Sequence, residues 1–134
     1  MNNDDIVSEL LYYGTDDWVL VQQVVHYCMA ADSASEPKTR VMLILSRLYS
    51  DGLMVPGDLG ESGFEVWDSP ESWLARSRSV LEGLNWEPLL GGFWLCNTPD
   101  GDRFVEGYVP IEEEFNFPSS SPFSQWLRQL WRCR

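Results

Sequence analysis

The residues that could carry catalysis are few and poorly grouped in this chain. The sequence has a single histidine, His26, which lies between Val25 and Tyr27 in a segment of helical character. An activated serine or cysteine nucleophile needs a base and an orienting acid beside it. None of the patterns GxSxG, GxxxxGK[ST] or GxGxxG is present. We therefore interpret His26 as a helix-surface or core-edge residue and expect no enzymatic activity.

Carboxylates and cysteines are the other groups that could act as acid and base or hold a metal ion. Asp16-Asp17 at a predicted helix start is better explained by the helix dipole, and Glu112 to Glu114 is typical of a solvated run. Cys28, Cys96 and Cys133 are widely spaced and form no CxxC pair. With one histidine they do not predict a zinc site. We expect no metal, no cofactor and reduced thiols.

Recognition of a charged partner is the chemistry that the sequence favours. The net charge is −12, and the stretch from Asp51 to Glu71 holds six acidic residues and no basic one. Such a surface repels phosphate backbones, so nucleic acid is not the favoured partner, and it attracts basic proteins. Carboxylates steer the encounter while aromatic rings anchor it. A solvated loop whose aromatic rings fold back onto the core is the alternative. The predicted partner-binding residues are Asp58, Glu61, Phe64, Glu65, Trp67 and Asp68.

These side chains are expected to lie on a small, mainly helical domain. Apolar residues at steps of three and four predict three helices: one capped by Asn3 or Asp4 and ended by Gly14, one from Thr15 to about Ala31, and one opening at Pro37. Gly52 suits the left-handed position just past the end of the third helix.

A β-hairpin is expected to follow. Leu53 to Val55 predicts a short strand closed by Pro56-Gly57, and it should pair antiparallel with Phe93 to Cys96. Between them, Ser69-Pro70-Glu71 predicts the capped start of a fourth helix that ends near Gly83. The span 56–88 would then be an enlarged wing with an inserted helix.

The stretch Thr98-Pro99-Asp100-Gly101 fits either a turn between two strands or a capped helix to about Glu106, and we favour the helix. The pattern Phe93-Trp94-Leu95-x-x-Thr98-Pro99-Asp100-Gly101-x-x-Phe104 resembles the wing strand and following helix of many bacterial winged-helix proteins. The resemblance spans about Thr15 to Gly107. It implies a winged-helix-like α+β fold, mainly α with a small antiparallel β-hairpin, here with a helix inserted in the wing and an added C-terminal helix.

Residues 110–134 differ from the domain at 1–109. An acidic linker leads into 122–134, where apolar side chains fall on one face of a short predicted helix: Phe123, Trp126, Leu127, Leu130 and Trp131. Residues 1–121 carry 21 acidic and 6 basic side chains, whereas 122–134 carry three arginines and no acid. A helix this short is marginal alone. We expect it to dock on its own domain or on a second copy in a homodimer, and we regard a membrane surface as the weakest alternative.

The start of the chain lacks signal-peptide character, and no apolar run reaches about 18 residues, so we expect a soluble cytoplasmic protein. The composition resembles that of small acidic immunity proteins of contact-dependent growth inhibition. This resemblance implies an immunity protein or antitoxin that covers the cleft of a basic toxin, expected to be a nuclease. The alternative is a winged-helix transcriptional regulator whose Lys38, Arg40 and Arg47 meet DNA. A third hypothesis is an adaptor or enzyme subunit without activity of its own.

Overall fold

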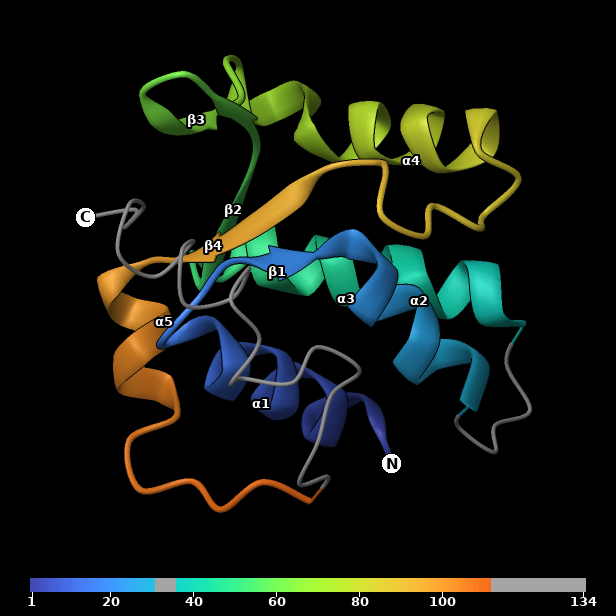
Figure 1. The fold of residues 1–134 in the computed structure, drawn as a ribbon. Coiled ribbons are helices and arrows are strands. Elements are labelled where there is room, and N and C mark those ends of the chain that lie inside the picture. Colours follow the sequence, from blue (N-terminus) through green and yellow to red (C-terminus); the bar gives the residue numbers. More distant parts are fainter. Residues whose placement is uncertain (31–35, 112–134) are drawn as a thin grey trace.

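The computed structural model describes residues 1–30 and 36–111, and the structural statements below refer to these residues. They form a mixed α+β fold, mainly helical with a small antiparallel sheet, as predicted (Figure 1). The elements are α1 (Asn3–Gly14), β1 (Val19–Leu20), α2 (Val21–Ala30), α3 (Pro37–Ser50), β2 (Met54–Gly60), β3 (Gly63–Val66), the 3-10 turn η1 (Pro70–Ser72), α4 (Trp73–Gly83), β4 (Trp94–Asn97) and α5 (Pro99–Phe104). The helix predicted within 122–134 lies outside the described residues.

The sheet has the strand order β1-β4-β2-β3, and every neighbouring pair is antiparallel. Val55 pairs with Cys96, so the predicted pairing of the two apolar runs is confirmed, and α4 lies between them in the chain as the expected insertion. Strand β1 was not predicted. The expected helix from Thr15 is wrong in its first part, because Val19 and Leu20 instead pair with Leu95 and Trp94 of β4.

The prediction that Pro56-Gly57 closes the strand is also wrong. Strand β2 runs on to Gly60 and pairs with β3, a strand that was not predicted from the sequence. The carbonyl of Pro56 accepts a hydrogen bond from Trp67 N at 3.0 Å, so the proline still serves the sheet as an acceptor. A Cβ on Gly57 would lie 2.4 Å from the backbone oxygen of Glu65 and 2.7 Å from the Phe64 ring. Gly57 therefore permits the close approach of β3.

The helix boundaries follow the predicted signals with small shifts. Asn2, one residue before the expected cap, forms a capping box with Asp5 at the start of α1. Gly52 adopts φ +66 after α3, and Thr98 Oγ1 accepts from Gly101 N at 3.1 Å, which confirms the helical alternative for α5. Ser69 directly precedes the helical turn η1, which begins at Pro70 as predicted, but its side chain makes no capping hydrogen bond, its φ is 55, and α4 itself begins only at Trp73.

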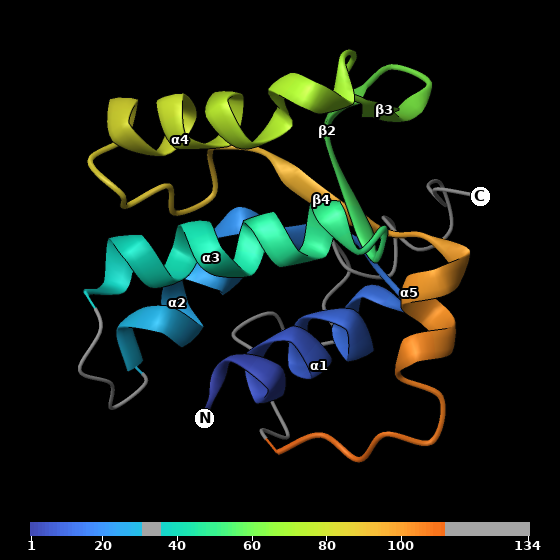
Figure 2. The ribbon, with the colours of Figure 1, turned by 180° about the vertical axis from the view of Figure 1, so that it is seen from behind.

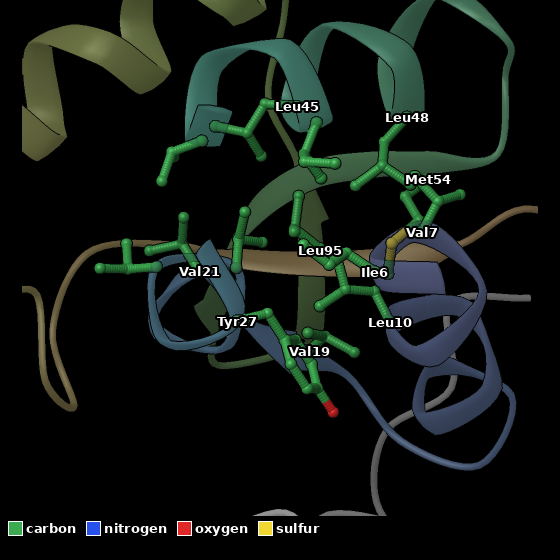
Figure 3. Close-up of a cluster of buried hydrophobic side chains, with 14 of the residues drawn as sticks. Ile6, Val7, Leu10, Val19, Val21, Tyr27, Leu45, Leu48, Met54 and Leu95 are labelled. Carbon is green, nitrogen blue, oxygen red and sulfur yellow. The ribbon is translucent and has the colours of Figure 1, made fainter. Parts of the chain in front are cut away.

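The main core lies between the sheet and the helices. Figure 3 shows Leu45 and Leu48 of α3 converging with Ile6 and Leu10 of α1 beside Leu95 of the sheet. Helix α3 lies between α4 on one side and α1 with α2 on the other (Figure 2). Within the described residues, no helix is long and apolar enough to cross a membrane.

Candidate partner-binding surface

The β2–β3 hairpin carries four of the six predicted partner-binding residues: Asp58, Glu61, Phe64 and Glu65. The strand register places Asp58, Phe64 and Glu65 on two different faces of the hairpin. Asp58 lies opposite Glu65, and Leu59 lies opposite Phe64. Directly opposed residues of an antiparallel pair share a face, and the next pair along points to the other face. The carboxylates of Asp58 and Glu65 therefore project from one face of the hairpin, while Phe64 projects from the other.

Trp67 is part of the fold, not a ring presented to solvent. Its side chain is 5% exposed, and its ring lies 4.7 Å from that of Phe93 between centroids. Its Nε1 donates to Asp58 Oδ2 at 2.9 Å, and the guanidinium of Arg76 lies 4.0 Å from the centre of its ring. The prediction that Trp67 contacts a partner is therefore wrong, because its ring packs onto the core.

The four carboxylates of this region are all exposed, and we call them the acidic hairpin: Asp58, Glu61, Glu65 and Asp68. Arg76 Nη2 lies 3.6 Å from Asp58 Oδ2. The other three carboxylates take part in none of the ion pairs found among the described residues. Like charges directly opposite each other on a sheet are unfavourable, and the Arg76 ion pair offsets this effect at Asp58 but not at Glu65.

Phe64 belongs to a second apolar group on the sheet face that points away from the main core. We call it the outer sheet cluster: buried Trp18 and Cys96, with half-buried Val55, Leu59, Phe64 and Trp94. The Trp18 ring lies 5.9 Å from Phe64 and 6.3 Å from Trp94 between centroids. This cluster was not predicted, although the uninterrupted apolar run from Phe93 to Cys96 is consistent with a strand that is buried on both faces.

The basic residues that the regulator hypothesis assigned to DNA are largely engaged within the fold. Arg40 is 4% exposed, and it donates from Nε to Asn3 Oδ1 and from Nη2 to Met1 O, both at 2.7 Å. Arg47 forms ion pairs with Asp4 and Asp51. Lys38 is exposed.

The inserted helix α4 packs directly on α3. Tyr49 and Ser77 share a hydrogen bond of 2.8 Å, and the Tyr49 ring lies 5.7 Å from that of Trp73 between centroids. Burial raises the pKa of Tyr49 far above its ordinary value, against a smaller opposing effect of the Ser77 hydrogen bond. Helix α3 is thus flanked on both sides, which does not suit a projecting recognition helix.

The candidate catalytic and metal-binding groups remain scattered. His26 is half-buried with its ring 5.7 Å from that of Tyr27. Within 1–30 and 36–111, no group of three His, Cys, Asp or Glu side chains is arranged to hold a metal. Cys28 is a free, buried thiol. Cys96 is disulfide-bonded, so the expectation that all thiols are reduced is wrong at this residue.

Two further features were not singled out from the sequence. Glu9 is fully buried, and its Oε1 accepts from Ile111 N at 2.8 Å, which ties the segment after α5 to α1. The loop after α4 exposes Leu89 and Leu90 by 68% and 75%. Figure 1 places this loop at the end of α4 that is far from the β2–β3 hairpin.

No protein-family model, no curated protein and no solved structure matches this chain.

Proposed function

We propose that this protein is a non-enzymatic protein-binding domain and, in its sharpest form, an immunity protein or antitoxin that neutralises a basic toxin. The observation that carries the proposal is the acidic hairpin, in which Asp58 and Glu65 lie side by side in register. Glu61 lies in the turn between the strands, and Asp68 follows β3.

The cost of this arrangement supports a binding role. Repulsion between opposed carboxylates lowers the stability of the free protein. A bound basic surface would relieve this repulsion and would itself be attracted by the carboxylates. Asp58 is also held in place by Trp67 Nε1, so part of the negative surface is ordered before any partner arrives. Preorganised side chains lose less conformational entropy on binding than mobile ones.

The mechanism is occlusion. Carboxylates at the hairpin take the positions that the phosphates of a nucleic acid would occupy on a basic cleft, so a nuclease toxin is excluded from its substrate. Long-range attraction between the −12 chain and a basic partner speeds the encounter, and salt screens it. Phe64 projects from the opposite face of the hairpin, in the outer sheet cluster, so the proposed contact rests on the carboxylates.

Affinity capture of the tagged protein from its native cells, with nuclease treatment and at low and moderate salt, is the direct test. One dominant basic protein that is toxic when produced alone, and harmless with this protein, is the expected result. Captured DNA that is lost on nuclease treatment would instead support the regulator, and a salt-sensitive mobility shift of promoter DNA would establish it.

The captured partner then allows the surface to be tested. The triple change Glu61→Lys, Glu65→Lys and Asp68→Lys should slow association by about 100-fold or more at low salt. The matched control is Asp16→Lys, Glu36→Lys and Glu106→Lys, which makes the same charge change at exposed positions elsewhere. An equal loss in both variants would mean that net charge alone matters, and unchanged binding in the first would exclude this face.

A further inference from the structure

We propose that the outer sheet cluster is the docking site of the chain's own segment 121–134, fixed there by a disulfide between Cys96 and Cys133. Cys96 lies within this cluster, in register with Val55 of β2. The described helices that form the main core pack with residues of the opposite face, such as Met54 and Leu95. The cluster is thus a second apolar surface on the sheet, in which Val55, Leu59, Phe64 and Trp94 are only half-buried.

The number and state of the cysteines indicate which residue forms the disulfide with Cys96. The chain has three cysteines, of which Cys28 is a free thiol and Cys96 is disulfide-bonded. Cys28 is also packed in the main core, whereas Cys96 belongs to the outer sheet cluster. Within one chain, Cys133 is the remaining sulfur that could complete the bond.

The composition of the segment complements the surface. Five apolar side chains, three of them aromatic, recur on one side of the helix predicted within 122–134, and they match the rings of Trp18, Phe64 and Trp94. Arg128, Arg132 and Arg134 also give the segment a positive charge, whereas all 21 acidic side chains of the chain lie before it, so their long-range attraction favours docking. An extended chain from Ile111 to Ser121 spans up to about 33 Å. This length allows the segment that follows to reach another face of a small domain.

Bond formation removes one hydrogen from each thiol, or two protons and two electrons in all. The oxidant is a protein or small-molecule disulfide. The Cys133 thiolate attacks one sulfur of this disulfide and expels a thiolate, and the Cys96 thiolate then attacks Cys133 in the mixed disulfide and expels the second. The oxidant leaves as two thiols.

Peptide mapping of the purified full-length protein tests the bond. The protein is alkylated in denaturant without reductant, digested and analysed by mass spectrometry. We expect the alkyl label on Cys28 and a linked pair of peptides containing Cys96 and Cys133. Label on Cys96, a link from Cys96 to Cys28, or a covalent dimer on a non-reducing gel would each overturn the proposal.

Hydroxyl-radical footprinting of the full-length chain tests the docking. The double variant Leu127→Glu and Leu130→Glu should raise oxidation of Phe64 and Trp94 several-fold. The control Gln125→Glu and Gln129→Glu adds the same charge on the side of the predicted helix away from its apolar face, and it should leave the oxidation of Phe64 and Trp94 unchanged. Circular dichroism shows whether each variant is folded. If the double variant is not folded, the single variant Leu130→Glu is used in its place. Equal oxidation in the wild type and the folded apolar-face variant would exclude the docking.

Discussion

The indole Nε1 of Trp67 donates a hydrogen bond to Asp58 Oδ2 at 2.9 Å, across the nine residues that separate them in the chain. This bond joins a buried core ring to an exposed carboxylate of the acidic hairpin. The guanidinium of Arg76 completes the group, since it lies over the ring and beside the carboxylate. The position of Asp58 is therefore set by Trp67, which packs on Phe93, and by Arg76 of α4.

Trp67→Phe tests this coupling. Phenylalanine retains an aromatic ring against Phe93 and loses the donor to Asp58, so we expect the free energy of unfolding to fall by about 1–3 kcal/mol. Trp67→Ala should cost about 3–5 kcal/mol, because it also leaves a cavity. Urea denaturation followed by circular dichroism measures both. Equal stability of the phenylalanine variant and the wild type would mean that the hydrogen bond contributes nothing.

Glu65→Gln should stabilise the isolated protein while weakening partner binding. It removes one of two opposed charges on the hairpin, which is worth about 0.2–1 kcal/mol. Glu61→Gln, in the turn, is the control for a general loss of charge. Denaturation at low and high salt measures the difference, which salt should reduce. A variant that is less stable than wild type at low salt would contradict the repulsion.

Gly14→Ala should be strongly destabilising. A Cβ at this residue would lie 2.1 Å from Oδ1 of Asn97, whose amide donates to Leu11 O at 2.8 Å and to Asp102 at 3.0 Å. We expect a loss of about 1–3 kcal/mol from overpacking.

Gly83→Ala is the matched control for Gly14→Ala. A Cβ there meets nothing within 4 Å at the last residue of α4, so it should be neutral or stabilise by up to about 1 kcal/mol. Similar losses of thermal stability in the two variants would show that the Asn97 contact is not decisive.

Arg40 should behave as a structural residue. Arg40→Gln breaks its hydrogen bonds to Asn3 and Met1 in a buried setting, and we expect a cost of about 2–3 kcal/mol. Lys38→Gln, at an exposed position on the same helix, loses only a contact of the ammonium with the Trp86 ring at 5.9 Å, so it should cost less than about 1 kcal/mol. Thermal denaturation compares the two. A stable Arg40 variant that had lost affinity for DNA would reverse the assignment and favour the regulator.

Alkaline pH should destabilise the protein through Cys28. Desolvation by burial raises the pKa of this thiol from 9.0 to about 11, with Arg40 acting weakly in the opposite direction. Between these values the native state retains a proton that the unfolded chain has released. The unfolding free energy should therefore fall by up to about 1.4 kcal/mol per pH unit as the pH rises above about 9.

Cys28→Ala should reduce the fall of the unfolding free energy with pH just above about pH 9. Urea denaturation at about pH 8 to 10 is the suitable window, because burial raises the pKa of Tyr108 to about 12 and its effect begins at higher pH. Parallel curves for the wild type and the variant would show that the thiol is not the cause.

Local signals in the sequence predicted the approximate positions of the helices and the central strand pair, although α2 and α4 begin later than expected. Pro37 and Gly52 mark the ends of α3, and Thr98 with Pro99 marks the start of α5. Capping and glycine signals act within a few residues, so they can be recognised without knowledge of the rest of the fold.

The tertiary structure alone decided the extent of the sheet and the composition of the candidate surface. Val19-Leu20 is extended because β4 lies beside it, and β2 continues through Pro56-Gly57 because β3 pairs with it. Trp67 is buried against Phe93, Arg40 is engaged by the start of the chain, and Arg47 pairs with Asp51. Acidic charge and aromatic content are properties of the sequence, but strand register decides which of these side chains share a face, since successive residues of a strand point in opposite directions.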